Sequence, residues 1–254
     1  MCFFRLEDLS IIKNGPAERR HFLDSELCQL DKVYLYQLSN YNKVVLQRNK
    51  LLKELYLHPD YREVLDVLDM QLVQYGSALI QRRQTFAEEL GEIVHRIHSQ
   101  LSGGQEEMEL KYEPNVTKDA FAQMLFANRE RDMRLKTTAT GPHRDDISFV
   151  VNGVDIRKFG SQGQQRTAAL SLKLSEIELV KRLIGDTPVL LLDDVLSELD
   201  SGRQNYLLNS IENIQTLITC TGLDEFVNHR FSINRIYKVT DGSVTVENKQ
   251  EANR

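Results

Sequence analysis

The sequence predicts a mixed α/β protein in which a long helical hairpin is joined to a layered region of helices and buried strands. Two observations carry this prediction. Residues 61–102 repeat apolar side chains at spacings of three and four, as one long amphipathic helix does. Residues 189–192 form a short all-apolar run, which is typical of a strand covered on both faces, and helical segments lie on either side of it.

The first hundred residues read almost entirely as helix. Three helices are expected, over residues 18–30, 33–57 and 61–102. The segment 58–60, His-Pro-Asp, breaks the pattern, and its Asp60 can cap the third helix. That helix would be on the order of 60 Å long at 1.5 Å per residue. A tight turn between two long amphipathic helices predicts an antiparallel hairpin arm.

The rest of the chain alternates strand and helix patterns, as a layered α/β head does. Strands are expected at residues 108–112, 147–151, 189–192 and 216–219, helices at 119–134 and 164–184, and a hairpin at 236–246 around Asp241-Gly242. We expect four regions: the end of an N-terminal head segment at 1–15, a helical arm at 16–106, a strand-and-helix return connection at 107–136, and the C-terminal half of the head at 137–254.

The composition excludes several classes of protein. Apolar residues make up 41% and charged residues 27%, which is ordinary for a soluble globular chain. No run of about 18 apolar residues occurs, so we expect no membrane span, and the N-terminus lacks the features of a signal peptide. The three cysteines, Cys2, Cys28 and Cys220, lie far apart. Their spacing favours a reducing cytoplasm over disulfides or a zinc site.

The formal net charge of -5 does not identify a nucleic-acid partner, because a domain that coats DNA is usually basic. Contact with DNA would have to come from local patches. The candidates are Arg19-Arg20, Arg82-Arg83 and the group Arg129, Arg131, Arg134 and Lys136. The alternative for each patch is a solvated helix face.

Two carboxylates follow the all-apolar run and are the strongest chemical signal. Asp193 and Asp194 would lie at the C-terminal edge of a central strand, where P-loop ATPases hold nucleotide and Mg²⁺. Asp193 would then orient the magnesium ion, and Asp194 would polarise the attacking water. The alternative is an aspartate that only caps the next turn.

The surrounding segments favour the nucleotide interpretation. Residues 197–200, Ser-Glu-Leu-Asp, match the D-loop of ABC-type ATPases. Upstream, Ser161 and Gly163 lie just before a long helix, where backbone N–H groups and the helix dipole form an anion site that suits a γ-phosphate presented by a partner subunit. The order of signature loop, helix, Walker B strand and D-loop predicts the C-terminal half of an ABC-type, SMC-like ATPase head.

A second segment copies the ABC signature letter for letter. Residues 101–105 read Leu-Ser-Gly-Gly-Gln, but they end the long amphipathic helix, and no Walker B strand follows within reach. We therefore interpret Gly103 and Gly104 as the C-cap of that helix and the loop at Ser161 as the working signature.

No P-loop motif GxxxxGK[ST] occurs in the 254 residues. The phosphate cradle and the first strands of the head are expected before Met1, so we interpret the chain as N-terminally truncated. Two expectations follow: the chain alone should not turn over ATP, and the strand at 189–192 should be left unpaired and prone to aggregation.

At this point the sequence resembles the RecF family of bacterial recombinational repair proteins, over almost its whole length. The most specific segments are residues 140–146, Thr-Gly-Pro-His-Arg-Asp-Asp, residues 160–167, Gly-Ser-Gln-Gly-Gln-Gln-Arg-Thr, and residues 192–195, Leu-Asp-Asp-Val. The role of His143 in the first of them does not follow from the sequence.

The resemblance implies ATP-driven head-to-tail dimerisation, binding to DNA gaps and single-strand/double-strand junctions, and cooperation with RecR and RecO in loading RecA during the SOS response. It also implies site residues. ATP of the opposite protomer and the dimer seam would be contacted by Ser161, Gln162, Gly163, Gln164 and Asp200. Many ABC proteins carry a switch histidine where this chain has residues 219–221, Thr-Cys-Thr, which leaves phosphate sensing there without its usual group.

Two other functions remain open at the level of sequence. The chain could be a non-enzymatic module that binds DNA or a partner protein through the arm and the group Arg129 to Lys136. It could also be half of the head of another ABC-like repair or chromosome protein, although those usually have longer coiled coils. Whether the chain is an enzyme is not decided by these patterns.

Overall fold

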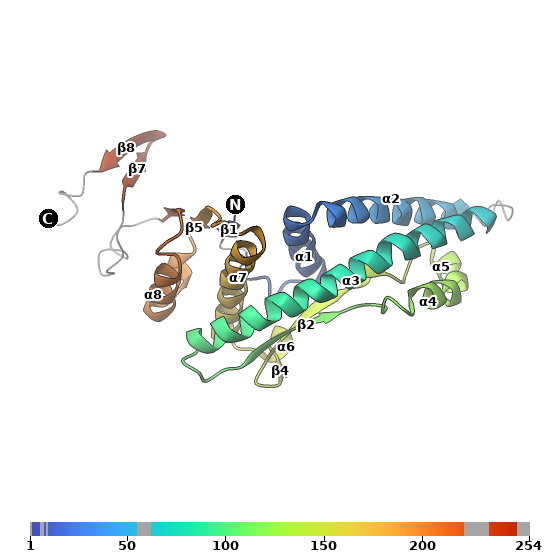
Figure 1. The fold of residues 1–254 in the computed structure, drawn as a ribbon, viewed down its shortest axis with the longest axis horizontal. Coiled ribbons are helices and arrows are strands. Elements are labelled where there is room, and N and C mark those ends of the chain that lie inside the picture. Colours follow the sequence, from blue (N-terminus) through green and yellow to red (C-terminus); the bar gives the residue numbers. More distant parts are fainter. Residues whose placement is uncertain (1, 6–7, 9, 55–61, 221–233, 248–254) are drawn as a thin grey trace.

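The computed structural model describes residues 2–5, 8, 10–54, 62–220 and 234–247. The molecule is elongated, with an arm of helices on one side and a small parallel sheet on the other (Figure 1). The mixed α/β fold is confirmed. The expected borders at residues 15, 106 and 136 fall in connections between elements, and the division into four regions stays a prediction.

Three helices build the arm, as predicted. They are α1 (Pro16–Leu30), α2 (Lys32–Glu54) and α3 (Arg62–Leu101), and α2 packs along α3 (Figure 1). Pro16 begins α1, where a missing N–H costs nothing. Asp31 separates α1 from α2, and its Oδ1 accepts hydrogen bonds from the backbone N–H groups of Val33 and Tyr34 at 2.9 and 3.1 Å. The expected ends of the hairpin, residues 55–57 and 61, lie outside the described residues.

Close packing around Gly76 holds the arm together. A Cβ at Gly76 would lie 2.4 Å from Cε1 of Phe121 and 3.0 Å from Cε2 of Tyr41. Both rings are almost fully buried, so neither can move away freely. Gly76 therefore allows α2 and the segment that contains Phe121 to meet on α3.

Gly76→Ala is expected to destabilise the protein by about 1–3 kcal/mol, because overpacking outweighs the gain in helix propensity. Urea unfolding followed by circular dichroism would measure this loss. Gly91→Ala is the matched control on the same helix, since its Cβ would meet only Leu110, at the ordinary distances of 3.5 and 3.9 Å. The control should be neutral or stabilising by up to about 1 kcal/mol; equal losses in both variants would contradict the packing argument.

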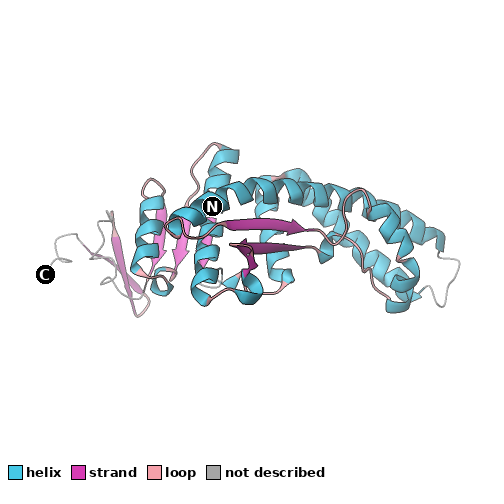
Figure 2. Ribbon diagram, turned by 90° about the horizontal axis from the view of Figure 1, so that it is seen from below, coloured by secondary structure: helices cyan, strands magenta, loops and turns pink. Residues whose placement is uncertain are grey.

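A second, antiparallel sheet lies along the arm (Figure 2). Its strands are β2 (Met108–Glu113), β3 (Asp146–Val151) and the short β4 (Val154–Asp155), in the order β2-β3-β4. Met108, Leu110 and Tyr112 alternate with exposed residues and face inward, and β2 packs against α3.

The expectation of a single helix at residues 119–134 is wrong. Two short helices form instead, α4 (Phe121–Ala127) and α5 (Arg129–Leu135), because Asn128 leaves the helical region with ψ near 0°.

The parallel sheet contains β1 (Cys2–Arg5), β5 (Leu190–Asp193) and β6 (Thr216–Thr219), in the order β1-β5-β6. The expectation that the strand at 189–192 has no partner is wrong, because β1 pairs with it on one side and β6 on the other. The prediction that both faces of this strand are covered holds in full for one face only. Leu190 and Leu192 are buried on that face, whereas Leu191 on the other face is half-buried, and its neighbours Phe3 and Leu217 are 41% and 54% exposed.

The remaining elements lead to the candidate site. α6 (Ile156–Phe159) comes directly before the long α7 (Gln162–Ile184), and η4 (Leu196–Glu198) and α8 (Ser201–Ser210) follow β5. β7 (Ile236–Thr240) and β8 (Ser243–Glu247) form the predicted hairpin, whose turn residues Asp241 and Gly242 have positive φ. None of the helices in the described part of the chain has the length and apolar character that a membrane crossing requires.

The motif at residues 141–146, Gly-Pro-His-Arg-Asp-Asp, joins the arm to the β2–β3 sheet. Asp145 is fully buried and accepts hydrogen bonds from Nη1 of Arg83 at 3.0 Å, from the Tyr112 hydroxyl and from the backbone N–H of Asn115. Asp146 forms a two-pronged ion pair with Arg19, at 2.6 and 2.9 Å. The motif therefore has a structural role that its sequence did not reveal.

His143 belongs to the same junction. Its Nε2 donates to the carbonyl oxygen of Thr138 at 2.9 Å, and its Nδ1 lies 2.7 Å from the Tyr41 hydroxyl. Burial lowers the pKa of His143 to about 4, so the ring is neutral at neutral pH. A neutral ring can donate at Nε2 and accept at Nδ1, which matches both contacts.

Candidate functional site

Two aspartates and one threonine meet at the C-terminal edge of the parallel sheet. Asp193 ends β5 in register with Thr219 at the end of β6. The Thr219 hydroxyl donates to Oδ1 of Asp193 at 2.6 Å, and the backbone N–H of Asp194 points to the hydroxyl and the carbonyl oxygen of Thr219, at 3.2 Å each. The two acids predicted from the sequence thus lie at the expected edge, and Thr219 fixes both. Thr221 lies outside the described residues.

Asp194 is held in an uncommon conformation for an acid. Its φ is +54°, in the left-handed region, and its Oδ1 is buried without a hydrogen-bond partner among the described residues. A buried carboxylate oxygen without a partner costs about 1–3 kcal/mol or more, so it needs a ligand or a water molecule. This oxygen is the structural feature that fits the predicted role of Asp194 next to a bound nucleotide.

The donor set suits Mg²⁺ only if further ligands come from elsewhere. The described residues contain no group of three or more His, Cys, Asp and Glu side chains placed to hold a metal ion. Asp193 and Asp194 could supply one or two carboxylate ligands. Mg²⁺ is commonly bound in this way, with one or two protein carboxylates and the remaining ligands from phosphates and water.

The predicted signature loop forms the N-terminus of α7. The Ser161 hydroxyl accepts from the backbone N–H of Gln164 at 3.2 Å, and Oε1 of Gln164 accepts from the backbone N–H of Ser161 at 3.0 Å. This reciprocal capping box fixes the first turn. The N–H groups of Gln162 and Gly163 lie in that turn, where no helical carbonyl can accept from them, and therefore remain available to an anion.

The two glycines of this segment have different roles. A Cβ at Gly160 would lie 2.6 Å from the carbonyl oxygen of Ile156, so the end of α6 requires glycine there. A Cβ at Gly163 would meet only Arg203 and Ser161, each at 3.9 Å. Packing within the chain thus does not require Gly163 to be glycine. A glycine that its own chain does not need is consistent with close approach by a ligand or partner.

Asp200 and the signature helix are connected by Arg203, a residue that the sequence analysis missed. Asp200 caps α8 by accepting from the backbone N–H of Arg203 at 3.0 Å, and the two side chains form an ion pair. The same guanidinium donates to the Thr167 hydroxyl at 2.6 and 2.9 Å and to the carbonyl oxygen of Gly163 at 3.4 Å. The D-loop and the signature loop therefore form one unit. The only sequence signal was an arginine three residues after an N-cap aspartate.

The perfect signature copy at residues 101–105 closes α3, as predicted. Gly103 and Gly104 have φ of +63° and +79°, and the N–H of Gly104 donates to the carbonyl oxygen of Ser99 at 2.7 Å. These positive φ values and the backward hydrogen bond are typical of a glycine C-cap. Residues 101–105 do not begin a helix, so they present no helix N-terminus to an anion.

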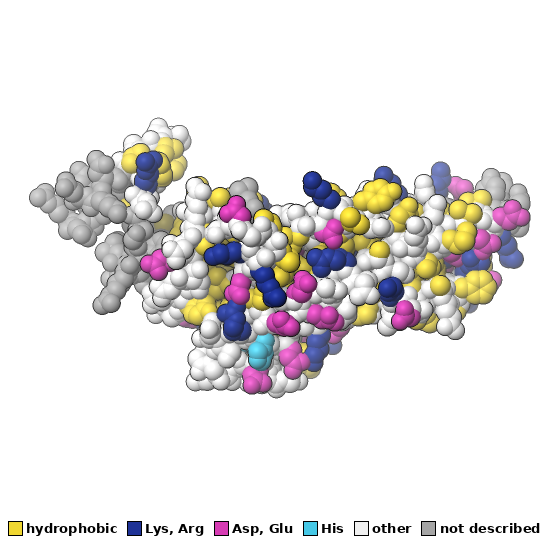
Figure 3. Space-filling view, in the orientation of Figure 1, with side chains coloured by type: hydrophobic (Ala, Val, Ile, Leu, Met, Phe, Trp, Pro, Cys, Tyr) yellow, Lys and Arg dark blue, Asp and Glu magenta, His cyan; other side chains and the backbone are white. Residues whose placement is uncertain are grey.

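The basic group on α5 is only partly available for nucleic acid. Arg129 forms ion pairs with Asp66 and Asp69, each at 2.6 Å, and its guanidinium lies 4.8 Å from the centre of the Phe126 ring. Three members of the group are exposed: Arg131, Arg134 and Lys136. On the face shown in Figure 3, basic side chains are scattered among acidic ones and form no continuous band. Of the other basic candidates, Arg19 and Arg83 are buried in ion pairs.

Three relatives of this chain among known proteins carry the same name. The chain is 61% identical over 246 residues to the DNA replication and repair protein RecF of Agathobacter rectalis, a match that covers 97% of this chain and 68% of the relative. It is 59% identical to the protein of the same name from Lachnospira eligens and 42% identical to that of Clostridium perfringens, with 69% and 68% of those relatives covered. No protein-family profile matches the chain.

Solved structures agree with these relatives. A structure described as the recombination mediator protein RecF-ATPrS in the RecFOR pathway superposes with a TM-score of 0.87 at 35% identity, covering 96% of this chain and 67% of that one. The Smc head domain of Pyrococcus furiosus superposes with a TM-score of 0.52 at 14% identity. The second likeness shows a shared fold alone.

Proposed function

The chain belongs to the RecF family of DNA replication and repair proteins, and from this premise we propose that it supplies the signature-loop side of an ATP site shared between two protomers. The capped N-terminus of α7 is the observation that carries the proposal. Ser161 and the free N–H groups of Gln162 and Gly163 would bind the γ-phosphate of ATP held by the opposite protomer. Gln164 would maintain the conformation of the signature loop through its capping box with Ser161. Asp200 would lie at the seam of a head-to-tail dimer.

The acids of β5 would serve a second ATP, bound on the same protomer. Asp193 would contribute to Mg²⁺ binding, and Asp194, through its unpartnered Oδ1, would orient and polarise the attacking water. When bound, the metal ion would neutralise phosphate charge. Because the 254 residues contain no GxxxxGK[ST] motif, the chain alone should not turn over ATP.

In the cell, the protein would act on DNA. We propose cytoplasmic location, ATP-dependent dimerisation, binding to gaps and single-strand/double-strand junctions, and cooperation with RecR- and RecO-type proteins in loading RecA during the SOS response. The support is family membership together with the solved relative that is described as a recombination mediator in the RecFOR pathway.

ATP-dependent association tests the shared site. The fluorescently labelled chain would be mixed with full-length RecF of Agathobacter rectalis, and sedimentation velocity would measure complex formation with and without ATP and Mg²⁺. Association should require ATP and should be lost in Ser161→Arg, which places a bulky side chain at the proposed phosphate site. Asp193→Ala is the matched control and should associate as the parent does, because Asp193 would serve the other site.

Association without ATP, or unchanged association of the Ser161→Arg variant, would contradict the proposal. So would Mg²⁺-dependent ATP turnover by the chain alone that Asp193→Ala removes.

A purely DNA-binding function is the second candidate, because Arg131 and Arg134 on α5 and Lys136 at its C-cap are exposed. Phe126 on α4, whose ring lies beside Arg129, is also 67% exposed. Fluorescence anisotropy with a gapped duplex over a range of salt concentrations would test this function. Charge reversal of Arg131, Arg134 and Lys136 should weaken binding and flatten its salt dependence by about one unit for each lost phosphate contact. Charge reversal of the exposed Lys181 and Arg182 at the far end of α7 is the control. Equal effects of both sets would remove α5 as the interface.

A further inference from the structure

The loop that closes the arm helix touches the signature loop. Glu106 lies just after the second signature-like segment, and its Oε1 accepts a hydrogen bond from Nε2 of Gln164 at 2.9 Å. Its other oxygen, Oε2, lies 3.1 Å from Nε2 of His98 in the last turns of α3. One carboxylate therefore connects the end of the 40-residue arm helix to the first turn of α7.

Gln164 uses both ends of its amide. Oε1 accepts from the backbone N–H of Ser161, and Nε2 donates to Glu106. Because the amide is planar, fixing one end fixes the direction of the other. Glu106 thus determines how firmly Gln164 holds Ser161, the residue proposed to contact the phosphate.

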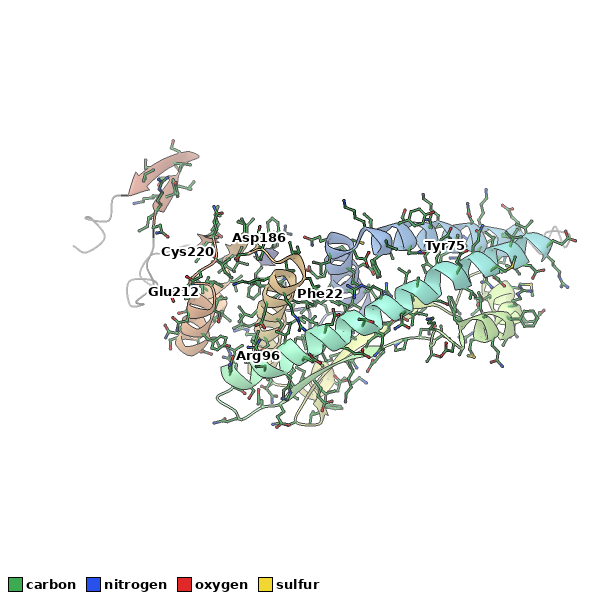
Figure 4. All side chains as sticks on the ribbon, viewed as in Figure 1. Phe22, Tyr75, Arg96, Asp186, Glu212 and Cys220 are labelled. Carbon is green, nitrogen blue, oxygen red and sulfur yellow. The ribbon has the colours of Figure 1, made fainter. Side chains whose placement is uncertain are left out.

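His98 lies on α3 and contacts both Glu106 and α7. It is fully buried, and burial lowers its pKa. Its Nε2–H donates to Glu106, and its Nδ1 lies 3.0 Å from the Ser171 hydroxyl, two turns further along α7. An ion pair between Arg96 on α3 and Glu178 on α7 extends the same contact. Figure 4 labels Arg96 near the end of α3 that lies beside α7.

The loop that carries Glu106 is itself fixed. The backbone N–H of Glu107 donates to Oδ1 of Asn152 at 2.8 Å, and the backbone N–H of Asn152 donates to the carbonyl oxygen of Glu107 at 3.0 Å. The backbone N–H of Glu106 donates to the Ser102 hydroxyl at 3.2 Å. Because these hydrogen bonds fix the loop, a displacement of α3 would move Glu106 together with the helix.

We propose that Glu106 is a positioning residue for the signature loop and that, together with His98, it couples the position of the arm helix to phosphate binding at Ser161. The proposal rests on the proposed function, because it assumes that the loop binds the γ-phosphate. Coupling of this kind is reciprocal: the position of the arm changes the affinity of the loop, and occupancy of the loop favours one position of the arm.

Hydrogen–deuterium exchange of residues 161–165 tests the positioning role in this chain without nucleotide. Glu106→Ala should accelerate exchange there about fivefold, the effect of losing one hydrogen bond of average strength. Glu106→Gln keeps an acceptor oxygen and should restore most of the protection. Glu107→Ala is the matched control, since Glu107 is the exposed neighbour with the same charge. Unchanged exchange in Glu106→Ala, or equal acceleration in Glu107→Ala, would overturn the proposal.

His98→Asn tests the link to the arm. Asparagine can replace the Nδ1 contact with Ser171 but does not reach Glu106, so exchange at residues 161–165 should rise although His98 does not touch them. Protection at 161–165 equal to that of the parent would overturn the link.

The association assay with full-length RecF supplies the functional measurement. The ATP concentration for half-maximal association should rise about fivefold in Glu106→Ala and stay unchanged in Glu107→Ala. If the parent chain does not associate at all, the proposed function fails, whereas the exchange measurements still decide the positioning role. If the parent associates and Glu106→Ala needs no more ATP than the parent, the coupling is overturned.

Discussion

Arg83→Met is expected to destabilise the protein by about 3–5 kcal/mol, because it removes one partner of a buried ion pair and leaves the other charged. Arg83 is 2% exposed, and its guanidinium donates to Asp145 at 3.0 Å, to Asp24 at 2.7 Å, to the Tyr34 hydroxyl at 2.9 Å and to the carbonyl oxygen of Pro142 at 2.6 Å. These contacts hold α1, α2 and α3 to the motif before β3. Urea unfolding followed by circular dichroism would measure the loss.

The adjacent arginine provides the control. The Arg82 side chain is 26% exposed and forms an ion pair with Asp31 at 3.3 Å, so Arg82→Met should cost less than about 1 kcal/mol. The double variant Arg83→Met/Asp145→Asn should lose at least about 1 kcal/mol less than the sum of its single variants, because it leaves no unpaired buried charge. Similar losses in Arg82→Met and Arg83→Met would show that the buried network is not what stabilises the junction.

The arm could be predicted from the sequence because its information is local. The three- and four-residue spacing along α3 and the glycines after Leu101 determine the helix and its end without reference to the rest of the chain. The pairing of β1 with β5 could not be predicted in this way. Phe4 and Leu192 lie opposite each other across 188 positions of sequence, and a four-residue strand at the N-terminus gives no pattern that identifies its partner.

The residues of the candidate site also differ in whether a local sequence pattern identifies them. Ser161 and the acids at 193 and 194 were found because the motifs that carry them are contiguous. Arg203 was missed because its partner Thr167 lies 36 residues earlier. The ion pair of Arg129 could not be predicted for the same reason, since its acidic partner Asp69 is 60 residues away on α3.

A group of carboxyls around one lysine joins the arm to the signature helix. Glu26 on α1 and Glu176 on α7 are both nearly fully buried and share a hydrogen bond. Lys173 forms an ion pair with Glu176 at 2.6 Å and lies 3.9 Å from Asp8. One ammonium group cannot balance three carboxylates at such close range. Burial, followed by the charge of Glu176, raises the pKa of Glu26 to about 8, so Glu26 holds a proton at neutral pH.

The expected consequence is a loss of stability as the pH rises. In the unfolded chain Glu26 has its ordinary pKa near 4.5, so between about pH 5 and pH 8 the folded protein binds one proton more than the unfolded one. The contribution of Glu26 to stability is fully present below that window and is lost as the pH passes through 8. Its slope is about -1.4 kcal/mol per pH unit. Glu26→Gln should remove this slope, because an amide can donate to Glu176 as the protonated acid does.

Urea unfolding of parent and variant at several pH values between 5 and 9 would measure the difference between their slopes. His143, whose pKa of about 4 gives a slope of opposite sign between pH 4 and pH 6.5, is present in both proteins and cancels in that difference. Glu18→Gln removes a carboxylate from the exposed first turn of the same helix and should leave the slope unchanged. Above pH 8 Glu26→Gln should be more stable than the parent by several kcal/mol, since it avoids burying a second negative charge beside Glu176. Parallel stability curves for parent and variant would show that Glu26 is ionised in the folded protein, and that Lys173 balances both carboxylates after all.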